Sequence, residues 1–190
     1  MVSCGSLNLS SDWSCDSCQV KISGREAMEF DNNLAKEGKK INKFNLANIE
    51  KFIDVYSKLL SENHVFLLQL KTWMVEGLNR LPYKTEGDVL LKKLKLIKEV
   101  QAGMKPFECT YSYLNGVLSI ELTDTIVQKL FQLFGQESMV KNLDPMQMIQ
   151  EAQDALSIAE VVFKHEDAKS QDHALKMKIC DLRMALSNFR

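Results

Sequence analysis

The fold is decided by residues 63–78, which read NHVFLLQLKTWMVEGL. Apolar side chains lie around most of the circumference of the helix that this stretch would form. Because such a segment needs partners on nearly every side, we expect a central core helix with other helices around it. Its uncharged part, residues 65–70, ends at Lys71 and is far shorter than the roughly twenty residues that a membrane-spanning helix requires. We therefore expect a soluble protein.

The composition of the 190-residue chain favours helices. Hydrophobic residues make up 45% of it, which is enough to bury a core, whereas 8 glycines and 3 prolines are too few for a turn-rich β-sandwich or barrel. The formal net charge of -1 gives no general basic surface, so we expect neither nucleic acid nor a membrane as a direct partner. The predicted fold class is all-α.

Amphipathic segments with recognisable starts lie before residues 63–78. Ser23 and Glu26 match the capping box that begins a helix, and this helix should run to about Gly38. Asn45 is a suitable cap for the next helix, because its side chain can accept a hydrogen bond from a free backbone amide. Both segments have an apolar face that needs a partner.

The pattern continues after residues 63–78. We expect a helix from about residue 85 to residue 103, followed by one long or kinked helix within residues 110–135. Residues 117–122 are rich enough in β-branched side chains that a strand is the alternative there.

Two further helix starts complete the series. Asp144 can cap a helix that has Pro145 in its first turn, and Ser170 or Asp172 can cap the last one. About seven consecutive helices joined by short links should fold into antiparallel hairpins. No fixed period of about 34 residues is visible, so we predict an irregular stack of antiparallel helix pairs resembling tetratricopeptide repeats, with a small cysteine knuckle before it.

Residues 1–22 lack a helical period, so we separate them from a helical domain at residues 23–190. Within them, Cys15 and Cys18 have the spacing from which a tight turn can bring two thiolates to one Zn²⁺. Cys4 is the other cysteine nearby and is the candidate third ligand. No secretory signal is visible, so the cysteines should be thiols or metal ligands in a reducing compartment. A pair of plain thiols is the alternative to a zinc site.

Catalytic motifs are not visible in the sequence. His64, His165 and His173 are isolated from one another, and no serine elbow, phosphate loop or His-Glu-x-x-His helix occurs. We expect these histidines to be cap or surface residues.

Several motifs occur in an order that resembles one known family. They are SSDWSCDSC at residues 10–18, ISGRE at 22–26, NHVFLL at 63–68, YLNGVLSIE at 113–121 and EAQDAL at 151–156. Together they resemble the C-terminal portion of SMYD proteins, the SET and MYND domain lysine methyltransferases, especially the arthropod forms. The resemblance implies a tetratricopeptide-like helical domain behind a cysteine-bearing segment.

The resemblance also implies a function. The family's SET core, which binds S-adenosylmethionine, and its MYND zinc module have no counterpart in this sequence, so we expect no catalytic residues, no S-adenosylmethionine binding and no enzymatic activity. The expected function is that of the non-catalytic C-terminal domain of a protein-lysine (histone-lysine) methyltransferase. Such a domain walls the substrate cleft and binds protein or peptide partners in the cytoplasm or nucleus. The alternative is a small zinc-stabilised helical adaptor unrelated to methyl transfer.

The same resemblance bears on the metal ligands. Cys4 corresponds to the second member of an earlier Cys-x-x-Cys pair, and Met1 stands at the position of the first member. The implied zinc site is therefore incomplete.

Partner contacts are expected on the polar faces of two helices. The predicted contact residues are Lys92, Lys95, Gln147, Gln150 and Gln153. The side chains expected to face the core are Leu94, Ile97, Ile149 and Leu156. The alternative is that the polar residues are only solvated, because patches are not readable from one sequence.

We predict that Cys15 and Cys18, with Cys4 as a poorer third ligand, form a weak zinc site, because a structural site needs a fourth ligand. Protein purified without chelator should contain less than one equivalent of zinc, and a strong chelator should remove it. A full equivalent of chelator-resistant zinc would contradict this ligand set. Cys15→Ala should leave the helices folded, because their apolar faces lie outside residues 1–22.

Overall fold

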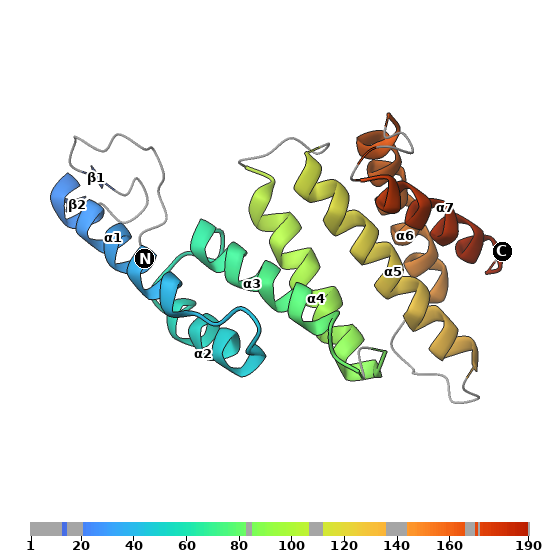
Figure 1. Ribbon diagram of the computed structural model, residues 1–190, viewed down its shortest axis with the longest axis horizontal. Helices are drawn as coiled ribbons and strands as arrows, with labels where there is room; N and C mark the ends of the chain where they lie inside the picture. The colour runs from blue at the N-terminus through green and yellow to red at the C-terminus, as the bar shows by residue number, and fades with distance from the viewer. Residues whose placement is uncertain are drawn as a thin grey trace. The chain divides into compact units, whose positions relative to one another are not determined.

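A computed structural model describes residues 13–14, 21–82, 85–106, 112–135, 144–165, 170 and 172–189. These residues are predominantly helical, which confirms the all-α class (Figure 1). The chain divides into two compact units, Met1–Gly77 and Leu78–Arg190. In the described ranges, no helix is long and apolar enough to cross a membrane. The helices are α1 (Gly24–Lys40), α2 (Leu46–Tyr56), α3 (Val65–Leu78), α4 (Gly87–Met104), α5 (Tyr113–Gly135), α6 (Pro145–Phe163) and α7 (His173–Ser187).

Two short strands precede the helices of the first unit. β1 (Trp13–Ser14) and β2 (Lys21–Ile22) pair in an antiparallel register in which Trp13 lies opposite Ile22. Residues 15–20 connect the two strands and lie outside the described residues.

Side-chain caps begin α1 and α2 at the predicted positions. The Ser23 hydroxyl accepts a hydrogen bond from the Glu26 amide at 3.2 Å, and the Glu26 carboxylate accepts one from the Ser23 amide at 3.0 Å. Asn45 Oδ1 accepts from the Asn48 amide at 3.0 Å. Each bond satisfies a backbone amide that a helix start leaves without an intrahelical partner.

The first turn of α3 also rests on a side chain. The Phe66 amide donates to His64 Nδ1 at 3.2 Å, so His64 is a cap residue, as the sequence predicts. Burial lowers the pKa of His64, against a smaller opposing effect of Asp31, and this favours the neutral ring that can accept the bond. The Phe66 ring meets Tyr56 of α2 edge to face, with 5.1 Å between the ring centroids. The side chains of α3 that are almost fully buried are Leu67, Leu70 and Met74.

In the second unit, α5 is the helix that the others surround. α4, α6 and α7 all pack against it, as Figure 1 shows. It is one unbroken helix, so the strand alternative for residues 117–122 is wrong. The sequence pattern places the central helix at residues 63–78, but in this unit the central position belongs to α5.

The apolar pattern does not single out α5 as the central helix, because α5 buries hydroxyl groups as well as apolar side chains. Thr123 is fully buried, and its hydroxyl lies 2.9 Å from the Ser119 carbonyl oxygen and 3.2 Å from that of Ala152 on α6. The Thr125 hydroxyl donates to the Glu121 carbonyl oxygen at 2.6 Å. Because these hydroxyls bond to main-chain carbonyls, their burial leaves no polar group without a partner, and a search for apolar periodicity overlooks them.

Consecutive helices of the second unit run antiparallel where side-chain contacts fix their direction. On α4 and α5, Gln101 Nε2 donates to Asn115 Oδ1 at 2.9 Å, whereas Lys93 contacts Glu121 at 2.8 Å. Rising residue numbers on one helix therefore match falling numbers on the next. This agrees with the predicted antiparallel pairs.

α5 and α7 run parallel to each other. Three contacts establish this direction: Tyr113 with Asp172, Glu121 with Lys178, and Phe131 with Phe189. The separation in residue number is nearly the same in all three, so α5 and α7 lie side by side over most of their length.

The caps of α6 and α7 differ. Asp144 accepts a hydrogen bond from the Met146 amide at 2.9 Å, which confirms the predicted start of α6. Asp172 precedes α7, but its side chain makes no cap bond. Its carboxylate instead accepts a hydrogen bond from the Tyr113 hydroxyl at 2.9 Å and joins the starts of α5 and α7.

Close packing of α5 on α6 depends on Gly116. A Cβ atom added there would lie 2.8 Å from Val162 Cγ1 and 3.0 Å from the Phe163 ring. Gly116→Leu should therefore overpack this contact and destabilise the second unit by about 1–3 kcal/mol. Gly135→Leu is the matched control, because a Cβ atom at Gly135 would have no atom within 4 Å.

Thermal unfolding followed by circular dichroism measures both variants. A Gly116→Leu protein as stable as the Gly135→Leu protein would contradict the close approach of α5 and α6.

Candidate functional site

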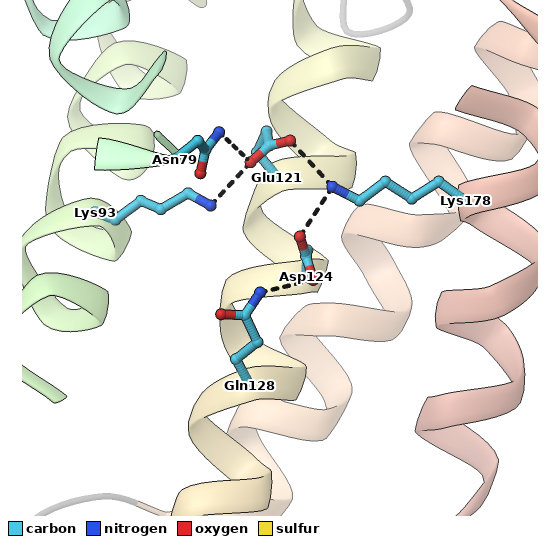
Figure 2. Close-up of a pocket in the computed structure, with 6 residues that line it drawn as sticks. All are labelled: Asn79, Lys93, Glu121, Asp124, Gln128 and Lys178. Carbon is cyan, nitrogen blue, oxygen red and sulfur yellow. Dashed lines mark hydrogen bonds and ion pairs between the residues drawn. The ribbon is translucent and has the colours of Figure 1, made fainter. Parts of the chain in front are cut away.

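A polar hollow of about 190 Å³ lies in the second unit where α4, α5 and α7 meet (Figure 2). We call it the polar hollow. Its lining residues are Asn79, Lys93, Glu121, Asp124, Gln128 and Lys178. None of them is among the site residues predicted from the sequence.

Glu121 is the centre of the polar hollow. Its Oε2 atom accepts from Lys93 Nζ at 2.8 Å and from Asn79 Nδ2 at 2.8 Å. Its Oε1 atom accepts from Lys178 Nζ at 3.2 Å. One carboxylate therefore joins side chains of α4 and α7 and the residue that follows α3, as Figure 2 shows.

Asp124 extends this network along α5. Its Oδ2 atom lies 2.9 Å from Lys178 Nζ, and its Oδ1 atom accepts from Gln128 Nε2 at 3.0 Å. Positions 121, 124 and 128 follow helical spacing, so their side chains share one face of α5. Lys178 bridges the two carboxylates.

The charges of the polar hollow fix one another. Burial alone would raise the pKa of Glu121, but Lys93 and Lys178 outweigh it and lower the pKa to about 2. Burial alone would lower the pKa of Lys178, but Glu121 and Asp124 outweigh it and raise that pKa. Two cations and two anions leave the hollow neutral.

This arrangement does not suit acid–base or nucleophilic catalysis. A general base needs a pKa near the working pH, and a nucleophilic lysine needs a lowered one. Glu121 and Lys178 are shifted in the opposite directions. The polar hollow is suited to binding and to holding helices together.

Binding capacity remains after these contacts are made. A lysine ammonium has three donors, and within the described part of the chain Lys93 Nζ donates to Glu121 alone. The side chain of Lys93 is only 4% exposed. The amide oxygens of Asn79 and Gln128 accept no hydrogen bond from any residue that the structure describes. The hollow therefore offers both donors and acceptors.

No protein-family model, curated protein or solved structure matches the chain. What the polar hollow does therefore has to be argued from its own geometry.

The candidate zinc ligands Cys4, Cys15 and Cys18 lie outside the described residues. Cys180 on α7 is exposed and free. Among the residues that the structure covers, no group of three or more histidine, cysteine, aspartate or glutamate side chains could hold a metal ion.

The predicted contact residues lie mostly where the sequence places them. Lys92, Lys95, Gln147 and Gln150 are exposed, and Gln153 is half-buried. Ile97, Ile149 and Leu156 are buried as predicted, whereas Leu94 is half-buried and not a core residue. Lys98 of α4 contacts Glu151 of α6 at 2.7 Å, an ion pair between two partly exposed side chains.

Two sequence signals could have revealed the polar hollow. Lys93 lies on the same helical stripe as Leu90 and Ile97, both of which are buried. Glu121 lies between Ile120 and Leu122 on a helix that is apolar over much of its surface. A charged residue on a buried face needs a partner of opposite charge, but the sequence does not say which one.

Glu121→Gln should remove much of the acid sensitivity of the second unit. The folded state lowers the pKa of Glu121 from 4.5 to about 2, so its stabilisation is present above 4.5 and lost as the pH falls toward 2. At neutral pH the variant should lose about 3 kcal/mol of unfolding free energy, because Lys93 stays buried without its counter-charge. Chemical denaturation at several pH values measures both effects.

Glu151→Gln is the matched control. Glu151 pairs with Lys98 at the surface, where an ion pair contributes about 0–1 kcal/mol. Its loss should change neither the stability nor the pH profile appreciably. If Glu121→Gln behaved like this control, the network would not be what joins α4, α5 and α7.

Proposed function

We propose that this chain is a non-catalytic helical domain of the SMYD type, which binds protein partners and, in a longer relative, walls the substrate cleft of a protein-lysine methyltransferase. The motif order described above motivates the proposal. Further support comes from α4 to α7, a series of adjoining helices in which the first and third of α5, α6 and α7 run parallel. Solenoid domains of the tetratricopeptide type are built from stacked helical pairs, so adjoining helices of this kind support the proposal.

The observation that carries the proposal is the joined surface of α4 and α6. Lys98 of α4 and Glu151 of α6 form an ion pair at 2.7 Å, so polar side chains of the two helices meet at this point. Lys92 and Lys95 on α4 are exposed beside this link. A broad polar face on rigid helices suits a protein partner better than a small molecule, which needs an enclosed and mostly apolar pocket.

The proposal includes a zinc site on the cysteines of residues 1–22. Ser14 of β1 pairs with Lys21 of β2, and the sequence between them carries Cys15 and Cys18. Two thiolates close together in sequence are the ligands that Zn²⁺ prefers. This observation also favours the second candidate function, a small zinc-stabilised helical adaptor unrelated to methyl transfer.

The proposal is tested by reversing charge on the α4 face. Lys92→Glu combined with Lys95→Glu should abolish capture of partners from an extract of the source cells, because both side chains are exposed beside the α6 face. Unfolding temperature should change little, because Lys92 and Lys95 are both exposed and the charges of exposed side chains contribute little to stability. Quantitative mass spectrometry of the captured proteins measures the effect.

Lys36→Glu combined with Lys39→Glu is the matched control, since both lysines are exposed on α1 and the change in net charge is the same. Capture should survive in this control. Capture that survives equally in both double variants would contradict a partner surface on α4 and α6. Calorimetric titration with S-adenosylmethionine adds a separate check, because micromolar binding would contradict the non-catalytic assignment.

A further inference from the structure

Three aromatic rings cluster at one end of the α5–α7 pair. The Phe131 and Phe189 rings meet edge to face with 4.9 Å between centroids, and Phe134 and Phe189 stack at 5.5 Å. Phe131 is 53% exposed and Phe134 is 62% exposed. Large apolar side chains exposed together mark interaction sites more often than scattered ones do. We call these three residues the phenylalanine cluster.

The phenylalanine cluster adjoins the polar hollow. On α5, Phe131 follows Asp124 and Gln128 at helical spacing, so the three share one face. On α7, Lys178 belongs to the hollow, and the chain beyond the end of the helix carries Phe189. Since α5 and α7 run parallel, the hollow and the cluster form one surface along the seam between them. At about 1.5 Å per helical residue, Asp124 and Phe131 are about 10 Å apart along α5.

The charge balance of the hollow indicates what could lie on it. An added carboxylate would face Glu121 and Asp124, and an added ammonium group would face Lys93 and Lys178. Each charged group would therefore be repelled by two side chains of its own sign. An uncharged group that both donates and accepts hydrogen bonds avoids this repulsion. A peptide main chain has this chemistry, since its carbonyl oxygen can accept from Lys93 and its amide can donate to the oxygen of Asn79 or Gln128.

We propose that the α5–α7 seam binds an extended, uncharged peptide segment, with its main chain on the polar hollow and one aromatic side chain on the phenylalanine cluster. An extended chain advances about 3.3 Å per residue, so the aromatic residue follows the main-chain contact by about three residues. This inference rests on the proposed function, because it names the part of a protein partner that is recognised. It uses a different surface from the α4 and α6 face.

The probe is a pool of capped heptapeptides with phenylalanine at the fifth position and alanine, serine or glutamine elsewhere. Titrated into the ¹⁵N-labelled full chain, the pool should shift backbone amide signals of α5 and α7 that border the hollow and the cluster. A pool with alanine at the fifth position should bind at least about tenfold more weakly. Pools with aspartate or lysine at the first three positions should also bind more weakly than the uncharged pool.

Two sets of variants locate the binding. Phe131→Ser combined with Phe134→Ser should weaken binding about tenfold, and Gln128→Ala should weaken it through loss of the main-chain contact. Val161→Ser is the matched control, since Val161 is 50% exposed on α6 next to the residues that pack against Gly116, at the other end of α5 from the cluster, and its loss should leave binding unchanged. Unfolding temperatures of all variants verify that they are folded.

The proposal is overturned if the phenylalanine pool causes no shifts at millimolar concentration, if the shifts lie elsewhere, or if the serine double variant binds normally. Self-association that is detected by sedimentation and lost in the serine double variant would assign the surface to a second copy instead. If the pool fails while partner capture still depends on Lys92 and Lys95, the peptide inference is wrong and the proposed function stands.

Discussion

The second unit depends on how the carboxylate of Glu121 is neutralised. Glu121 is on the central helix, largely removed from water, and a carboxylate in that position is costly unless it is paired and hydrogen-bonded. Lys93 comes from α4 and Lys178 from α7, so one charge ties two of the three helices that pack on α5 to the same point. A slide of α7 by one turn would separate Lys178 from Glu121 and Asp124, so the network favours one register between α5 and α7.

The two sides of α5 serve different purposes. Toward α6, Gly116 permits close approach and Thr123 bonds to a main-chain carbonyl, so that side is closed by packing. Toward α4 and α7, Glu121 and Asp124 form charged contacts around the polar hollow. The same helix is thus tightly packed on one face and held by charged contacts on the other.

Two surfaces of the second unit are consistent with protein binding, and their chemistry differs. The joined face of α4 and α6 carries exposed lysines and glutamines, which suit a polar partner. The seam of α5 and α7 combines a neutral polar hollow with the exposed rings of Phe131 and Phe134. A polar rim with a few aromatic anchors is common in protein interfaces, where the anchors supply most of the affinity.

Local signals in the sequence determined where the helices begin. Ser23, Asn45 and Asp144 bond to backbone amides within their own first turns, so a few neighbouring residues are enough to predict them. The all-α class follows from composition and helical periodicity in the same way. Tertiary structure alone decided that α5 is the central helix and that Lys93, Glu121 and Lys178 meet. Those outcomes depend on residues far apart in sequence, and a buried charge or hydroxyl shows which face is unusual without showing which distant group satisfies it.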